Sequence, residues 1–215
     1  MRAPPARYTE ASALNPEAGN HVVTSDAREL AAARRAAQRT WAHFPYYARR
    51  YGARGRQFAL SDSGWLATLC DLEPPAAVEQ VKWLGVVLSS RGMPQWMLEL
   101  HLEMLHEELA RAIPEAPGHY DVLLGGAAAL REMRERHFPP ARFQSLAAAF
   151  DARVGPTLSR QHRGMGGILV SAVADEREGI EQAVPVLAAW ARDPAIFPPE
   201  WIAAVDATLA EARAS

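Results

Sequence analysis

The segment FPYYARRYGARGR, residues 44–56, contains three tyrosines and four arginines and no acidic residue. Guanidinium groups bind carboxylates and phosphates through paired N–H donors, and aromatic rings can stack on nucleic-acid bases. The segment therefore has three possible roles. It could bind nucleic acid, hold an anionic ligand, or neutralise an acidic face of its own fold.

The arginine excess is wider than this segment, because seven arginines and no acidic residue lie between Leu30 and Ser61. Pairing with carboxylates of the region 99–115, or with Asp62, is the favoured interpretation for much of this charge. We expect three arginines to lie on a solvated or internally paired helix face: Arg34, Arg35 and Arg39. The remaining residues are expected to border a binding surface: Tyr47, Arg49, Arg50, Tyr51, Arg54 and Arg56. Arg54 and Arg56 flank Gly55 in a turn-prone stretch, and are expected to remain free for a ligand or partner.

Motifs for catalysis or metal binding are weak. His101 and His106 are five residues apart, about 140° around a helix, whereas H-E-x-x-H requires a spacing of four. A site of His101, Glu103 and His106 is thus only a weak alternative to a solvated acidic helix face. Cys70 lies in an apolar context, GWLATLCDL, which favours a buried inert thiol over a nucleophile. We expect no catalytic site, metal or cofactor.

The whole-chain properties limit the possible classes. The 215 residues carry a net charge of −2, which disfavours a protein that coats nucleic acid by bulk charge. No secretory signal precedes the chain's first helix, and no apolar run approaches the ~20 residues of a membrane helix. With the single cysteine, these features predict a cytoplasmic protein without membrane contact. Lys82 is the only lysine, which, with the high alanine content, is typical of a GC-rich bacterial genome.

Helical periodicity predicts an all-α fold. Residues 1–25 have no periodic apolar pattern and are interpreted as a flexible leader. A first helix is expected from Asp26, with Ser25 as its N-cap and Pro45 at its end. The further predicted helices cover residues 62–72, 76–91, 94–113, 120–138, 141–154, 166–176, 179–192 and 198–214. The only segment that could instead be a buried strand is GGILVSAV, residues 166–173.

The two halves of the chain also resemble each other. The triplets at 78–80 and 180–182 match. Further on, Pro94 and Trp96 match Pro199 and Trp201. We interpret this as a duplication, with repeat units at 26–116 and 117–215 packed as one globule. The tryptophans at 83, 96, 190 and 201 lie on apolar stripes and are expected to pack in the core or between the repeats.

Residues 46–110, including RYGARGRQFALSDSGWLATL and VEQVKWLGVVLSSRGMPQWMLELHLEML, resemble a helical module of bacterial sensory and regulatory proteins that often precedes a cobalamin-binding unit. The D-x-H-x-x-G motif, whose histidine binds cobalt in many such units, is absent, so the resemblance implies no cofactor residue. It implies a non-enzymatic regulatory module that binds a partner protein or a small anionic ligand. A haem or cobalamin sensor using His43, His101 or His106 is the alternative, and nucleic-acid binding is less favoured.

Overall fold

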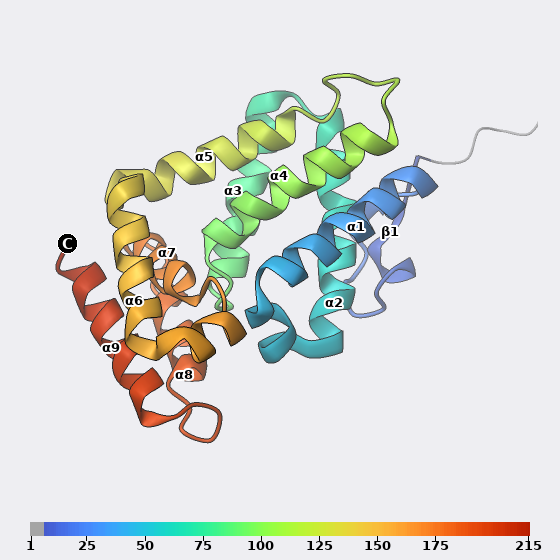
Figure 1. The fold of residues 1–215 in the computed structure, drawn as a ribbon. Coiled ribbons are helices and arrows are strands. Elements are labelled where there is room, and N and C mark those ends of the chain that lie inside the picture. Colours follow the sequence, from blue (N-terminus) through green and yellow to red (C-terminus); the bar gives the residue numbers. More distant parts are fainter. Residues whose placement is uncertain (1–6) are drawn as a thin grey trace, which may run out of the picture. The chain divides into compact units, whose positions relative to one another are not determined.

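The computed structural model describes residues 7–215, and helices make up most of them, so the all-α prediction is confirmed (Figure 1). The α-helices are α1 (Ala27–His43), α2 (Pro45–Thr68), α3 (Pro74–Ser89), α4 (Gln95–Ala112), α5 (Val122–His137), α6 (Pro140–Gln161), α7 (Met165–Arg177), α8 (Ala183–Ala191) and α9 (Pro199–Arg213). Short 3-10 helices occur at Ala11–Ala13 and Leu69–Asp71, and two strands are β1 (Tyr8–Glu10) and β2 (Val22–Thr24). Among the described residues, no helix is both long and apolar enough to cross a membrane.

The segment before α1 differs from the predicted flexible leader. Strands β1 and β2 pair antiparallel, with Tyr8 opposite Thr24, and the side chains of Ala11 and Val23 are fully buried. Strands of three residues are too short to show an alternating pattern, which is why sequence analysis missed them. The prediction is wrong for residues 8–24, and residues 1–6 of the predicted leader lie outside the described residues.

The first two helices begin where local chemistry places them, with two departures from prediction. Asp26, rather than Ser25, caps α1, because its Oδ1 accepts hydrogen bonds from the backbone N–H groups of Arg28 (2.7 Å) and Glu29 (3.3 Å). Pro45 begins α2, as a proline tolerates the first helical position. The arginine-rich segment is therefore helical rather than a turn at Gly55, and it is kinked at Gly52, whose φ of 54° suits glycine.

The chain forms two compact units that do not match the predicted repeat units. Unit 1 comprises residues 7–42 with Tyr47–Val81 and Leu100–Ala127, and unit 2 comprises His43–Tyr46, Lys82–Glu99 and Ala128–Ser215. The matched triplets also differ in local structure, since residues 78–80 lie within α3 whereas 180–182 form the turn before α8. Internal duplication therefore stays a prediction.

The core of unit 1 combines small and large side chains. Ala32, Ala33 and Ala36 of α1 are fully buried, as are Leu102, Leu105 and Leu109 of α4. These leucines are spaced three and four residues apart, as expected for the buried stripe of a helix. Alanines on α1 allow its backbone to approach its neighbours closely, which positions the arginines on its other faces.

Unit 2 is built around α7, which contacts α6, α8 and α9 (Figure 1). Every residue from Met165 to Asp175 is buried. The segment is a central helix and not a strand, and this position explains why its sequence is hydrophobic on every side. A Cβ at Gly166 would lie 2.5 Å from the carbonyl oxygen of Ala147, and one at Gly167 would lie 2.5 Å from the Trp96 ring. The two glycines thus permit close helix packing.

The tryptophan prediction is only partly right. Trp201 is fully buried and its indole N–H donates to the carbonyl of Ala191 at 3.0 Å. Trp96 and Trp190 are partly buried in aromatic contacts of unit 2 with Phe44 and Phe197, respectively. Trp83 is 58% exposed, so it is not a core residue.

A buried carboxylate of α7 holds the start of α4. Asp175 is 2% exposed, and its Oδ2 accepts hydrogen bonds from the Ser89 hydroxyl (2.6 Å) and the Gln95 backbone N–H (2.9 Å). The latter is an N–H that the helix itself cannot satisfy. Burial raises the pKa of Asp175 to about 7; the two hydrogen bonds oppose this shift, and the charge of Glu178 adds to it.

We expect Asp175→Asn to change the pH dependence of stability. Because folding raises the pKa of Asp175, its contribution to stability is greatest below about pH 4 and is lost as the pH rises to about 7. The asparagine variant cannot ionise and keeps an acceptor oxygen. Urea unfolding from pH 4 to 8 should therefore show the variant gaining stability relative to the natural protein as the pH rises. Asp175→Ala, which also cannot ionise but removes the acceptor, should be about 1–3 kcal/mol less stable than the asparagine variant throughout. A difference between Asp and Asn that does not change with pH would contradict the assignment.

Candidate functional site

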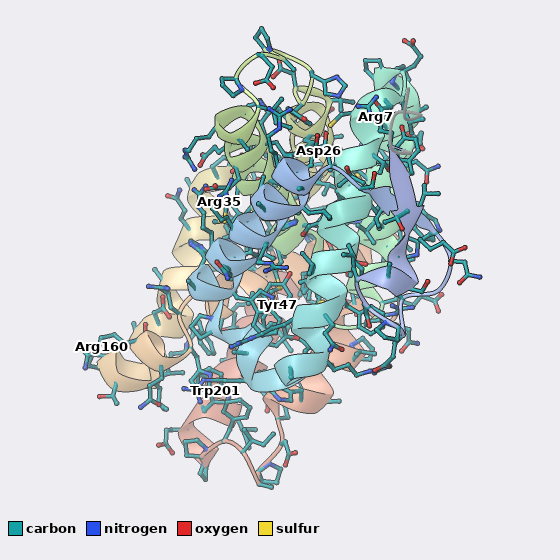
Figure 2. The ribbon with its side chains drawn as sticks, turned by 90° about the vertical axis from the view of Figure 1, so that its right-hand side faces the viewer. Arg7, Asp26, Arg35, Tyr47, Arg160 and Trp201 are labelled. Atoms are coloured by element: carbon teal, nitrogen blue, oxygen red, sulfur yellow. The ribbon has the colours of Figure 1, made fainter. Side chains whose placement is uncertain are left out.

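Helices α1 and α2 of unit 1 carry the arginine-rich segment and lie side by side (Figures 1 and 2). They run antiparallel: the Arg56 guanidinium of α2 lies over the Trp41 ring of α1, and further along α2 a Cβ at Gly64 would lie 3.7 Å from the Leu30 side chain. Residues far apart on this segment of the sequence therefore share one surface.

One side of α1 is neutralised by α4, as predicted for Arg35 and Arg39. Glu108 accepts hydrogen bonds from Arg35 Nε (2.8 Å), Arg39 Nη1 (3.0 Å) and Arg111 Nη1 (2.6 Å), although its side chain is only 4% exposed. Arg39 also pairs with Glu107 at 2.7 Å. Burial by itself would raise the pKa of Glu108, but the three arginines outweigh it and lower the pKa to about 2.

The predicted binding residues of α2 separate into different environments. Arg54 pairs with Glu17 at 2.7 Å and its guanidinium lies over Phe58, so the prediction that it is free is wrong. The Arg50 guanidinium lies over Tyr51, with 5.3 Å between it and the ring centre. Arg49 is exposed, and no carboxylate partner for it occurs within residues 7–215.

Between α1 and α2 lies a groove with a volume of about 410 Å³. Its lining residues are Arg34, Ala37, Gln38, Trp41, Ala42, Ala48, Arg56 and Leu60. The volume falls within the range of about 300–1,000 Å³ that is usual for small-molecule pockets. Of the binding residues predicted from sequence, only Arg56 lines this groove.

Trp41 is the organising side chain of the groove. Its indole stacks on the Tyr47 ring, with ring centroids 5.5 Å apart and ring planes 15° apart. The Arg56 guanidinium lies over the Trp41 ring, 5.1 Å from the ring centroid. A guanidinium stacked on a ring still directs its N–H donors outward in its own plane. The contact with Trp41 thus leaves N–H donors of Arg56 available for an anion.

Tyr47 supports Trp41 as a neutral phenol. Burial raises the pKa of Tyr47, with smaller contributions from Tyr51 and the Asp62 carboxylate. Its hydroxyl therefore keeps its proton at any physiological pH, and its ring provides an uncharged platform. The structure brings Tyr47 next to Trp41 rather than into the groove lining.

The groove carries uncompensated positive charge. Arg34 and Arg56 are both exposed, and neither has a carboxylate partner in the part of the chain that the structure describes. Arg34 thus lies on a solvated side of α1, as predicted, while its neighbour Arg35 faces Glu108. The remaining lining is apolar apart from Gln38 and the indole N–H of Trp41.

Sequence reasoning missed Arg34, Gln38, Trp41 and Leu60 as lining residues. A signal was present on α1, because residues 34, 37, 38, 41 and 42 follow the spacing of one helix face. That face did not stand out in the sequence, since it mixes alanine, glutamine and arginine instead of forming an apolar stripe.

The histidines of α4 do not form a common site. His101 is buried between Thr40 Oγ1, 2.9 Å from its Nδ1, and Ser63 Oγ, 2.9 Å from its Nε2, and burial lowers its pKa to about 4. His106 instead lies 3.0 Å from Asp121. No group of three or more metal-binding side chains occurs among residues 7–215.

The Ser63–His101 pair resembles part of a nucleophilic site only in its distance. Ser63 is fully buried, its hydroxyl also lies 2.5 Å from the carbonyl oxygen of Ala59, and Thr40 makes the same kind of contact with Ala36 at 3.0 Å. A substrate could not reach this hydroxyl without unfolding the helix contacts. The cluster therefore serves to join α1, α2 and α4 in unit 1.

Two further candidates are also accounted for by packing. Cys70 is buried, and burial raises its pKa to about 12, which keeps it a protonated thiol as predicted. His43, at the end of α1, lies edge-on against Phe44, and partial burial and the nearby Arg163 lower its pKa. Neutral imidazole can ligate iron or cobalt, but nothing in these contacts points to a tetrapyrrole.

Comparison with known proteins found no matching family, no matching curated protein and no matching solved structure. The resemblance of residues 46–110 to a helical module of sensory proteins therefore stays a prediction.

We expect Glu108→Gln to destabilise the protein by about 1–3 kcal/mol, the usual effect of hydrogen bonds to a charged group. Because the folded pKa of Glu108 is lowered to about 2, its contribution to stability is complete above its unfolded pKa. It is lost as the pH falls from about 4.5 to about 2. Denaturant unfolding at pH 7 and at pH 3 measures both effects. The matched control is Glu107→Gln, which changes a side chain that is 52% exposed and that pairs, among residues 7–215, with Arg39 alone. It should cost less than about 1 kcal/mol. Equal effects of the two variants would contradict the assignment.

Proposed function

We propose that this protein is a helical ligand-binding module of the regulatory kind, and that it binds a small organic anion in the groove between α1 and α2. The observation that carries the proposal is the pair of exposed arginines, Arg34 and Arg56, which line an otherwise mainly apolar groove without a carboxylate partner among residues 7–215.

The groove offers the two kinds of contact that an organic anion needs. Arg56, held over Trp41, presents N–H donors that suit a carboxylate or phosphate. Leu60 and the alanines at 37, 42 and 48 provide apolar surface for the body of the ligand. Apolar lining with a few placed polar groups is the usual composition of small-molecule sites.

A small ligand is favoured over nucleic acid by how the aromatic rings are used. Three arginines cover one face of the rings of Tyr51, Phe58 and Trp41, the last of which also stacks on Tyr47. A base would have to displace these contacts before it could stack. The net charge of −2 also provides little non-specific attraction to nucleic acid.

The proposal is tested with octanoate, benzoate and phenyl phosphate as probes, and with octanamide and benzamide as uncharged analogues. We expect at least one anion to raise the melting temperature and to give saturable binding in calorimetry, because a ligand that binds only the folded state stabilises it. The amides should have no effect. Arg56→Gln should weaken binding by roughly tenfold or more, the usual effect of losing a charge-assisted hydrogen bond.

The matched control is Arg49→Gln, which removes the same charge from an exposed arginine outside the groove. It should leave affinity within about twofold of the natural protein, because only screened long-range charge is lost. Equal weakening by the two substitutions would refute the groove as the site. So would the absence of binding by all three anions.

A further inference from the structure

We infer that the ligand carries two acidic groups joined by an apolar chain, one group for Arg34 and the other for Arg56. This inference rests on the proposed function and specifies the ligand class of the same groove.

The two arginines are anchored at different levels of the groove. Arg56 lies over Trp41, and Arg34 is seven residues before Trp41 on α1, a rise of about 10 Å. On the antiparallel α2, Leu60 follows Arg56 by one turn, about 6 Å along the axis toward the level of Arg34. The two side chains thus leave the backbone at different levels along the groove, not at a single point.

The surface between these two positions is uncharged. The lining residues near this part of α1 and α2 are Ala37, Gln38 and Leu60. A charged group placed there would lose water without gaining an ionic partner, which is unfavourable. An apolar chain would instead bury its methylene groups against these side chains.

A ligand with one acidic group would satisfy only one of the arginines. The second acidic group of a dianion would gain a charge-assisted contact with the other and would also reduce the repulsion between two unpaired cations. The geometry therefore favours an elongated dianion over a monoanion with the same carbon chain.

The experiment compares suberate, which has a carboxylate at each end, with octanoate, which has the same number of carbons and a single carboxylate. Both are titrated into the full chain by calorimetry in low-salt buffer. We expect suberate to bind about tenfold more tightly, a difference of about 1.4 kcal/mol. Glutarate, a shorter dicarboxylate with less apolar chain to bury, should bind less tightly than suberate.

Two substitutions assign the gain. Arg34→Gln should abolish the preference for suberate, while Arg49→Gln, the control outside the groove, should preserve it. Both positions are exposed and have no carboxylate partner in the described chain, so thermal unfolding should show both variants folded with melting temperatures close to that of the natural protein.

The remaining outcomes separate this inference from the proposed function. If octanoate binds as tightly as suberate and its binding requires Arg56, the dianion inference is overturned and the proposed function stands. A preference for suberate that Arg34→Gln and Arg49→Gln reduce equally also overturns the inference, since diffuse charge would then explain it. If neither compound binds, and benzoate and phenyl phosphate also fail, the inference and the proposed function fall together.

Discussion

Glu108 is nearly inaccessible to water and has three guanidinium groups within hydrogen-bonding distance. An isolated carboxylate in that position would be strongly unfavourable, so the arginines of α1 must lie against α4 for the unit to fold. The rotation of α1 about its own axis follows from this pairing. The fully buried alanines at 32, 33 and 36 allow the close approach that the pairing requires.

Arg34 on the adjacent face of α1 and Arg56 on α2 have no carboxylate partner among residues 7–215, and this difference generates the candidate site. Guanidinium groups on these faces lie over aromatic rings instead, most clearly where Arg56 lies over Trp41 and Trp41 stacks on Tyr47. Stacking of this kind stabilises a guanidinium by about 0.5–1 kcal/mol at an exposed position, less than an ionic partner would in a buried one. The free N–H donors of Arg56 are thus compatible with a stable fold and with an anion taken from solution.

Unit 2 uses one buried acid for a different purpose. Asp175 holds the start of α4 by accepting hydrogen bonds from a backbone N–H and from the Ser89 hydroxyl, and its raised pKa indicates that this position favours the neutral form. The surrounding α7 is buried on every side, where glycines at 166 and 167 allow contact with Ala147 and Trp96. These are structural roles, and they explain why an acid and a glycine pair without a recognisable motif are present there.

The sequence alone determined the helical class and most helix boundaries, because leucine spacing and prolines such as Pro45 act over a few residues and do not depend on distant partners. It also revealed the surplus of arginine between residues 30 and 61. It did not reveal the β1–β2 pairing or the kink at Gly52. Nor did it distinguish Arg34 from Arg35, which are neighbours in the chain but point about 100° apart on a helix. Only the packing of α1 against α4 decides that Arg35 is neutralised by Glu108 while Arg34 faces the groove, since a carboxylate 73 residues away makes the difference.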